Sequence, residues 1–153
     1  MTTRTRRRSV LALAAFLASC GGHDFEPPDR GERVRHALAE YSPATFDTIT
    51  WASEEDRTTL GNQIYVENCR DCHGPLGRGR TDYAREQGLD VPSLVEPGWP
   101  LAVADSLHKV IFVGHEEGMP IYADGAISPR EIDAVAGYIL QVLRPDVAGG
   151  QGR

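Results

Sequence analysis

The chain has 153 residues, of which 41% are hydrophobic and 25% are charged. This length allows one small domain with short extensions, and the composition argues against a chain that is disordered throughout. The formal net charge is −6 at pH 7, and an acidic chain lacks the basic surface that nucleic-acid phosphates require, so we predict no nucleic-acid partner.

Residues 1–19 have the pattern of an export signal. Four arginines precede an almost wholly apolar run at 10–19, which is too short to cross a membrane because a spanning helix needs about 20 apolar residues. The end of this segment, LASC, resembles the bacterial lipoprotein box, in which the cysteine is lipidated. The resemblance implies a lipid on Cys20, with ordinary signal cleavage as the alternative. We therefore expect export to the periplasmic or cell-surface side of a bacterial membrane, with lipid as the anchor.

Residues 20–52 are predicted to form a tether and an N-terminal extension. Removal of residues 1–19 takes away four of the 16 basic residues and no acidic one, so 12 basic and 22 acidic residues remain, a net charge of −10. Glycines, a proline pair and charges at 21–30 are typical of a linker. A short amphipathic helix is predicted over 31–41 from the spacing of Val34, Ala37, Leu38 and Tyr41. Three more apolar residues are expected to fold onto the main domain: Phe46, Ile49 and Trp51.

The core domain is predicted to span residues 53–144. Its first helix should begin after Ser53, whose side chain can cap it, and a second helix should follow Asp105 and stop at Gly114. The last helix has the clearest start, SPRE, because this sequence combines an N-cap serine, a proline and a glutamate three residues after the cap. Apolar residues at three-four spacing then continue to Arg144: Ile132, Val135, Ile139 and Val142. Residues 145–153 should be a flexible tail.

Two glycines interrupt the first and last helices of this domain, at Gly61 and Gly137. Each costs about 1 kcal/mol relative to alanine, so a packing reason is expected. We predict that the two helices cross there, backbone against backbone, with Tyr65 and Tyr138 packed around the contact.

Cys69 and Cys72 lie three residues apart, and His73 follows directly. Zinc normally takes four protein ligands, and the sequence has no second close pair of cysteines or histidines. A redox-active cysteine pair belongs after a strand, whereas a helical pattern runs into Cys69. The spacing C-x-x-C-H is instead typical of covalent haem attachment, because two thiols on one helical turn can reach the two vinyl groups and the histidine can bind iron. A simple disulfide remains the alternative.

Met119 is the candidate for the opposite face of such a haem, since it is the only methionine besides the initiator. Pro120 disfavours helical geometry at Met119, so the side chain should come from an extended loop. Histidine and methionine are a common pair of axial ligands. His108 and His115 are the rivals, and each is more simply a core or surface histidine.

Residues 53–144 resemble a class I c-type cytochrome. The resemblance rests on the order of a helix that enters CRDCHG, a glycine-rich loop, a middle helix, GMP and a final helix. It implies an all-α fold in which the first and last helices cross, around one covalently bound haem c. It also implies a proline carbonyl that receives the N–H of His73, for which Pro92 and Pro75 compete. Trp99 and Tyr122 are expected either to line the haem pocket or to pack in the core.

The function expected from this set is that of a one-electron carrier and not of an enzyme. An iron that His73 and Met119 hold from both sides has no free position for a small-molecule substrate, so the partners should be redox proteins that dock briefly. The alternative is a haem peroxidase or gas-binding protein in which Met119 is displaced from the iron or does not bind it. A third possibility is a lipoprotein interaction domain that the two cysteines staple as a disulfide.

Overall fold

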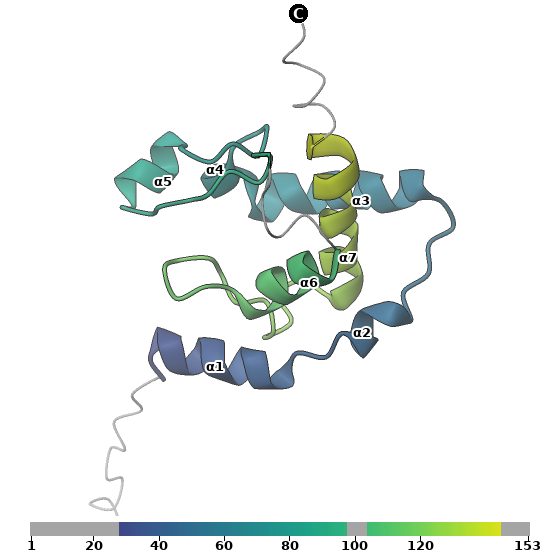
Figure 1. The fold of residues 1–153 in the computed structure, drawn as a ribbon, viewed down its shortest axis with the longest axis horizontal. Helices are drawn as coiled ribbons and strands as arrows, with labels where there is room; N and C mark the ends of the chain where they lie inside the picture. The colour runs from purple at the N-terminus through teal and green to yellow at the C-terminus, as the bar shows by residue number, and fades with distance from the viewer. Residues whose placement is uncertain (1–27, 98–103, 145–153) are drawn as a thin grey trace, which may run out of the picture.

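The computed structural model describes residues 28–97 and 104–144, and these form helices and no strand (Figure 1). The helices are α1 (Arg30–Glu40), α2 (Ala44–Asp47), α3 (Glu54–Asn68), α4 (Arg70–His73), α5 (Asp82–Glu86), α6 (Ala104–Val113), α7 (Pro129–Tyr138) and a π-helical turn, η1 (Ile139–Leu143). The all-α prediction is therefore confirmed. The predicted export signal, Cys20, Trp99 and the tail at 145–153 lie outside the described residues.

Helices α3 and α7 cross, as Figure 1 shows, and Gly61 of α3 lies against Ala134 of α7 at the contact. A Cβ atom on Gly61 would lie 2.2 Å from the carbonyl oxygen of Ala134 and 2.7 Å from Cβ of Tyr138, so no side chain fits there. The rings of Tyr65 and Tyr138 pack beside the crossing with their centroids 5.5 Å apart. The predicted crossing is confirmed at Gly61.

Gly137 has a different packing reason from the one predicted. A Cβ atom there would lie 2.7 Å from Nε of Arg57, so this glycine makes room for a guanidinium group and not for the backbone of α3. The sequence pattern could not distinguish the two cases, because both call for a helical residue without a side chain.

The helix starts follow the sequence closely. The hydroxyl of Ser53 accepts a hydrogen bond from the N–H of Asp56 at the start of α3, and Ser128 and Glu131 form the complete capping box of α7. Helix α6 begins at Ala104, slightly earlier than predicted, and ends before Gly114, which has a φ of +72°. Glycine adopts this conformation without the cost that a side chain would add.

The end of the last helix differs from the predicted α-helical spacing. From Ile139 the chain forms the π-helical turn η1, in which Ile139 and Leu143 are buried while Val142 is only half-buried. A π-helical turn takes in an extra residue, so the buried face moves by one position from Val142 to Leu143. The predicted three-four spacing therefore holds as far as Ile139 but not at Val142.

The segment before α3 folds back over the domain, as its apolar residues predicted. Helix α1 packs against α6 and α2 packs against α7. The ring of Phe46 stacks on the imidazole of His108 at 4.2 Å, and Trp51 donates a hydrogen bond to a carboxylate oxygen of Asp133 at 2.7 Å. Ala37 is the buried residue of α1, whereas Leu38 is 47% exposed, so the predicted apolar face is narrower than its spacing indicated.

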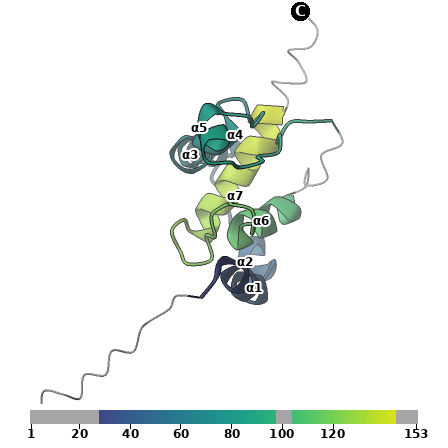
Figure 2. The same ribbon diagram turned by 90° about the vertical axis from the view of Figure 1, so that its left-hand side faces the viewer.

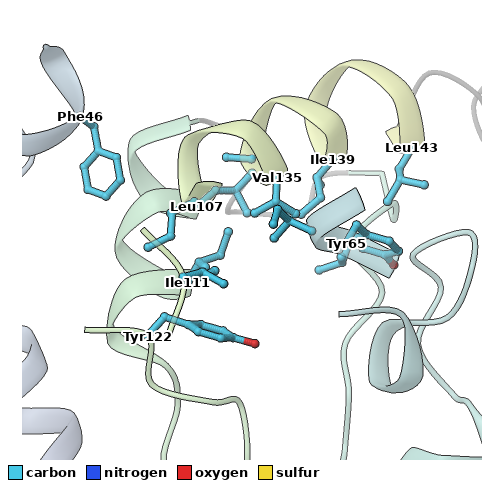
Figure 3. Packing of buried hydrophobic residues seen from close by; sticks show 13 residues of the cluster. Phe46, Tyr65, Leu107, Ile111, Tyr122, Val135, Ile139 and Leu143 are labelled. Atoms are coloured by element: carbon cyan, nitrogen blue, oxygen red, sulfur yellow. The ribbon is translucent and has the colours of Figure 1, made fainter. Parts of the chain in front are cut away.

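The hydrophobic core follows α7 from end to end. In Figure 2, α7 runs diagonally from the group α3, α4 and α5 to the group α1, α2 and α6. The buried side chains lie along it, from Phe46 at one end to Tyr65 and Leu143 at the other (Figure 3). Helix α7 therefore connects two groups of helices that have little other contact. Within the described residues, no helix is both long and apolar enough to cross a bilayer.

Candidate haem-binding site

The two cysteines lie where one helix passes directly into the next. Cys69 is at once the C-terminal cap of α3 and the N-terminal cap of α4, and Cys72 belongs to α4. Both thiols are free and half-buried. Cys69 packs against the edge of the hydrophobic core, which ties the motif to the α3–α7 crossing. The predicted helical turn for the pair is confirmed.

The thiols do not have the character of a redox-active pair. Burial first, and Cys72 second, raise the pKa of Cys69 to about 12, and burial and then Asp71 raise the pKa of Cys72. Reactive cysteines instead have a lowered pKa, because the thiolate is the nucleophile. In residues 28–97 and 104–144, moreover, no three His, Cys, Asp or Glu side chains gather as a metal site. These features disfavour a catalytic cysteine pair and a zinc site.

His73 carries the most informative atom of the site. Its Nδ1 is buried and is without a hydrogen-bond partner of normal geometry among the described residues. Burial lowers the pKa of the imidazole and outweighs the carbonyl of Pro92, which raises it. The Pro92 carbonyl is therefore close to the ring, although the two atoms do not meet the geometry of a full hydrogen bond. Buried polar atoms normally have a partner, so this one needs an explanation.

A bound haem would not itself be a partner for Nδ1, but it would fix the ring so that the Nδ1 N–H can point at the Pro92 carbonyl. An axial histidine binds iron through one ring nitrogen and commonly directs the other N–H at a backbone carbonyl. Ligation would hold the ring by Nε2 and leave Nδ1 to face Pro92. Free thiols at positions 69 and 72 and an unpartnered Nδ1 on His73 thus fit a covalently attached haem.

Two glycines bring the Pro92 segment to His73, and the sequence marked them only as part of a glycine-rich loop. A Cβ atom on Gly79 would lie 2.3 Å from the carbonyl oxygen of Val91, and Gly79 has a φ of +66°. The carbonyl of Gly77 accepts the N–H of Leu94 at 2.7 Å, and that of His73 accepts the N–H of Gly79 at 2.7 Å. These contacts hold residues 91–94 beside α4.

Met119 lies in the loop between α6 and α7, outside any helix, as predicted. Its side chain is half-buried and packs against the same hydrophobic core as Cys69. The loop turns back on itself, because the N–H of His115 donates to the carbonyl of Met119 at 3.2 Å. In Figure 1, this loop and α4 lie on the same side of α7, one below the other.

The two rival histidines have other surroundings. His108 is buried, and its Nε2 lies 3.0 Å from Oδ1 of Asp133 while its ring stacks on Phe46. The side chain of His115 is 62% exposed, and its Nδ1 accepts the N–H of Glu117 at 3.2 Å. His108 therefore has a structural role, and His115 lies on the surface.

Two tyrosines flank the cysteine motif. The hydroxyl of Tyr65 donates to the carbonyl of Gly74 at 2.6 Å, which ties α3 to the end of α4. Burial first, and then the neighbouring cysteines, raise the pKa of Tyr122 to about 12. Figure 3 shows the Tyr122 hydroxyl pointing away from α6, toward the side on which Tyr65 lies. Tyr122 therefore lies in the core and beside the candidate site, so both roles expected for it are compatible.

Comparison with protein families gives a match to this part of the chain. Residues 56–139, more than half of the chain, match the family described as cytochrome C oxidase, cbb3-type, subunit III. The matched residues run from the first turn of α3 into η1, and so include the cysteine motif and Met119.

Curated proteins with similar sequences carry related names. The cbb3-type cytochrome c oxidase subunit CcoP of Rhodobacter capsulatus is 31% identical over 94 residues, which cover 57% of this chain and 30% of that protein. CcoP of Rubrivivax gelatinosus is 22% identical over 125 residues, 81% of this chain and 38% of that protein. The subunit FixP of Bradyrhizobium diazoefficiens is 32% identical over 80 residues, 52% of this chain and 25% of that protein.

The chain thus spans between a quarter and two fifths of the length of these relatives. No solved structure matches it significantly.

Proposed function

Because the chain belongs to the family of cytochrome C oxidase, cbb3-type, subunit III, we propose that it is a one-electron carrier with a single covalently attached haem c. The observation that carries the proposal is the buried, unpartnered Nδ1 of His73 directly after two free cysteines. A haem iron supplies reversible one-electron oxidation and reduction when it is bound.

Each site residue has a separate task in this proposal. Cys69 and Cys72 hold the haem through two thioether bonds, and His73 is the axial ligand that the same helical turn carries. Met119 is the sixth ligand from the loop between α6 and α7. A sulfur ligand favours ferrous iron relative to a second imidazole, so it raises the reduction potential. Cys69 and Met119 both pack against the hydrophobic core, so apolar side chains would help to exclude water from a haem held there, and this would also raise the reduction potential.

The partners in this proposal are redox proteins that donate and accept single electrons. Two ligands from the chain leave the iron without a position for a small-molecule substrate. The related proteins carry the names of oxidase subunits, so an oxidoreductase complex is the partner that we favour. Redox partners commonly meet through small interfaces, which suits a domain of this size.

The proposal also includes export and a lipid anchor on Cys20. The support is the sequence itself, in which arginines, a short apolar run and LASC follow one another. Residues 20–52 would then join the anchor to the domain at 53–144. Mass spectrometry of the mature chain measures both modifications, since lipid on Cys20 and haem on the CRDCH segment add mass to different peptides.

The decisive experiment compares wild type with Met119→Ala after expression in a host equipped for cytochrome maturation. A pyridine haemochrome assay should report covalent haem in both proteins, and the ferric wild type should have a far-red sulfur-to-iron band that the variant lacks. Rapid, stoichiometric binding of carbon monoxide should appear only in the reduced variant. A colourless wild-type protein would overturn the proposal of a covalent haem. A reduced wild-type protein that binds carbon monoxide rapidly would favour the peroxidase or gas-binding alternative.

A further inference from the structure

The first residue of α1 reaches across to the loop that holds Met119. Nε and Nη2 of Arg30 donate to the carbonyl oxygen of His115 at 3.0 and 2.9 Å, and Nη2 also donates to the carbonyl oxygen of Met119. One guanidinium therefore bridges two carbonyls that lie four residues apart in the loop. The planar fork of arginine suits this bridging geometry, and charged donors form stronger hydrogen bonds than neutral ones.

The side chain of Glu116 also approaches α1 at Gly31, but among the described residues the hydrogen bonds between α1 and the loop all come from Arg30. A groove of about 760 Å³ lies between them, with Arg30, Arg33 and His36 on the helix side and Gly118 and Pro120 on the loop side. Apolar packing does not fill this groove, so the polar bridge from Arg30 is the specific connection across it. The loop itself closes through the hydrogen bond from His115 to Met119, to which Arg30 adds a second donor on the same Met119 oxygen.

The other end of α1 is anchored independently. Ala37 is buried, the Tyr41 hydroxyl donates to the carbonyl of Asp105 at 3.3 Å, and the Tyr41 ring packs on Phe112 with their centroids 5.8 Å apart. These contacts fix α1 along α6, so Arg30 is presented to the loop from a supported helix. Figure 1 shows α1 running beneath α6 and the loop that follows it.

We propose that Arg30 is a positioning residue for Met119, and that α1 acts through it as a brace which keeps the methionine loop closed. The inference rests on the proposed role of Met119 as sixth ligand. A loop that opens more often exposes the iron to competing ligands, so the apparent affinity for an external ligand rises with the fraction of open loop.

The test measures binding of imidazole to the ferric holoprotein by absorbance. Arg30→Ala should bind imidazole about 5- to 10-fold more tightly than wild type, since it loses a charged bridge that is partly exposed to solvent. The far-red sulfur-to-iron band should weaken at the same temperature, while far-ultraviolet circular dichroism should report unchanged helix content. A variant that only destabilised the fold would instead lose helix content together with the band.

Arg35→Ala is the matched control, because Arg35 is an exposed arginine of the same helix without a hydrogen bond or ion pair to the loop among the described residues. It should bind imidazole as wild type does. Arg30→Lys keeps the charge but loses the fork, and it should lie between wild type and Arg30→Ala. If Arg30→Ala fails to fold, Arg30→Lys tests the proposal in its place.

The outcomes separate this inference from the function on which it rests. If Met119→Ala abolishes the far-red band but Arg30→Ala and Arg30→Lys bind imidazole as wild type does, the proposed role of Arg30 is wrong. The proposal that Met119 is the sixth ligand is then unaffected. If Met119→Ala leaves the band unchanged, Met119 is not the ligand and both proposals fall.

Discussion

The two sides of the candidate haem site are built in different ways. On one side, Cys69, Cys72 and His73 occupy a single turn of helix, so their spacing along the chain fixes their arrangement. On the other side, Met119 lies in a loop whose shape depends on residues far away in the sequence, among them Arg30. If the proposed function is right, attachment of the haem would be a local property of this chain, whereas the position of the proposed sixth ligand would depend on tertiary contacts.

The largest effect is expected from a change at the α3–α7 crossing, because both sides of the candidate site rest on it. Gly61→Ala would force a Cβ atom to within 2.2 Å of the Ala134 carbonyl and push α3 away from α7. We expect a loss of at least about 3 kcal/mol in the free energy of unfolding, because neither helix backbone can move aside locally. Chemical denaturation of the holoprotein, followed by circular dichroism, measures this loss.

Gly31→Ala provides the control for that substitution. Gly31 lies in the first turn of α1, and a Cβ atom there would approach only side-chain atoms, at 3.3 Å or more. It should change the free energy of unfolding by less than about 1 kcal/mol. Equal effects of the two substitutions would show that the crossing at Gly61 is not specially close.

A smaller effect is expected from the polar cluster that joins the two groups of helices through α7. The carboxylate of Asp133 accepts hydrogen bonds from Trp51 at 2.7 Å and from Arg57 at 2.8 Å, and lies 3.0 Å from Nε2 of His108. Asp133→Asn removes the closer of the two charge partners of the partly buried Arg57 guanidinium and leaves only Glu54, at 3.6 Å, so we expect a loss of about 2 kcal/mol at pH 7. Covalent haem should remain, because the cluster does not touch the cysteines.

The same cluster predicts a direction for the pH dependence. Burial raises the pKa of Asp133, but hydrogen bonds from His108 and Trp51 and the charge of Arg57 together hold it below the ordinary value of 3.8. A lowered pKa in the folded state means that the stabilisation is present above pH 3.8 and is lost as the pH falls through the folded-state value. The difference in stability between wild type and Asp133→Asn should therefore shrink below about pH 4. A difference that stays constant down to pH 3 would contradict this prediction.

Apart from the Gly31→Ala control, the smallest effect on stability is expected from Gly114→Ala. This substitution should affect the methionine side of the site and leave the cysteine side unchanged. Gly114 has a φ of +72°, and a Cβ atom there would lie 2.5 Å from the Pro120 carbonyl and 2.8 Å from the Met119 carbonyl. The substitution should cost about 1–2 kcal/mol and displace the methionine loop. We expect a weakened sulfur-to-iron band together with full covalent haem, measured on one sample by absorbance and by the pyridine haemochrome assay.

Gly79→Ala is the matching change on the other side of the site. A Cβ atom there would lie 2.3 Å from the Val91 carbonyl and would displace the segment that faces His73, while the methionine loop stays as it is. If Gly79→Ala and Gly114→Ala have the same spectra, the two sides of the site are not independent and the comparison fails.

The sequence by itself determined whatever depends on near neighbours in the chain. Ser53 and Ser128 cap their helices because a side-chain oxygen and the free N–H groups lie within three residues. The CRDCH motif likewise fixes its own turn of helix. Even the crossing at Gly61 was predictable, because a glycine inside a helix has an energetic cost that close packing explains.

Only the tertiary structure decided the contacts between distant segments. The sequence gives no sign that Gly137 accommodates Arg57, that η1 buries Leu143 instead of Val142, or that Arg30 bridges the methionine loop. Each of these depends on where two segments meet after the helices have packed, and the free energy of that packing is a sum over many side chains. The methionine side of the site is of this kind, which is why the sequence could nominate Met119 as a ligand but could not predict which residues hold its loop.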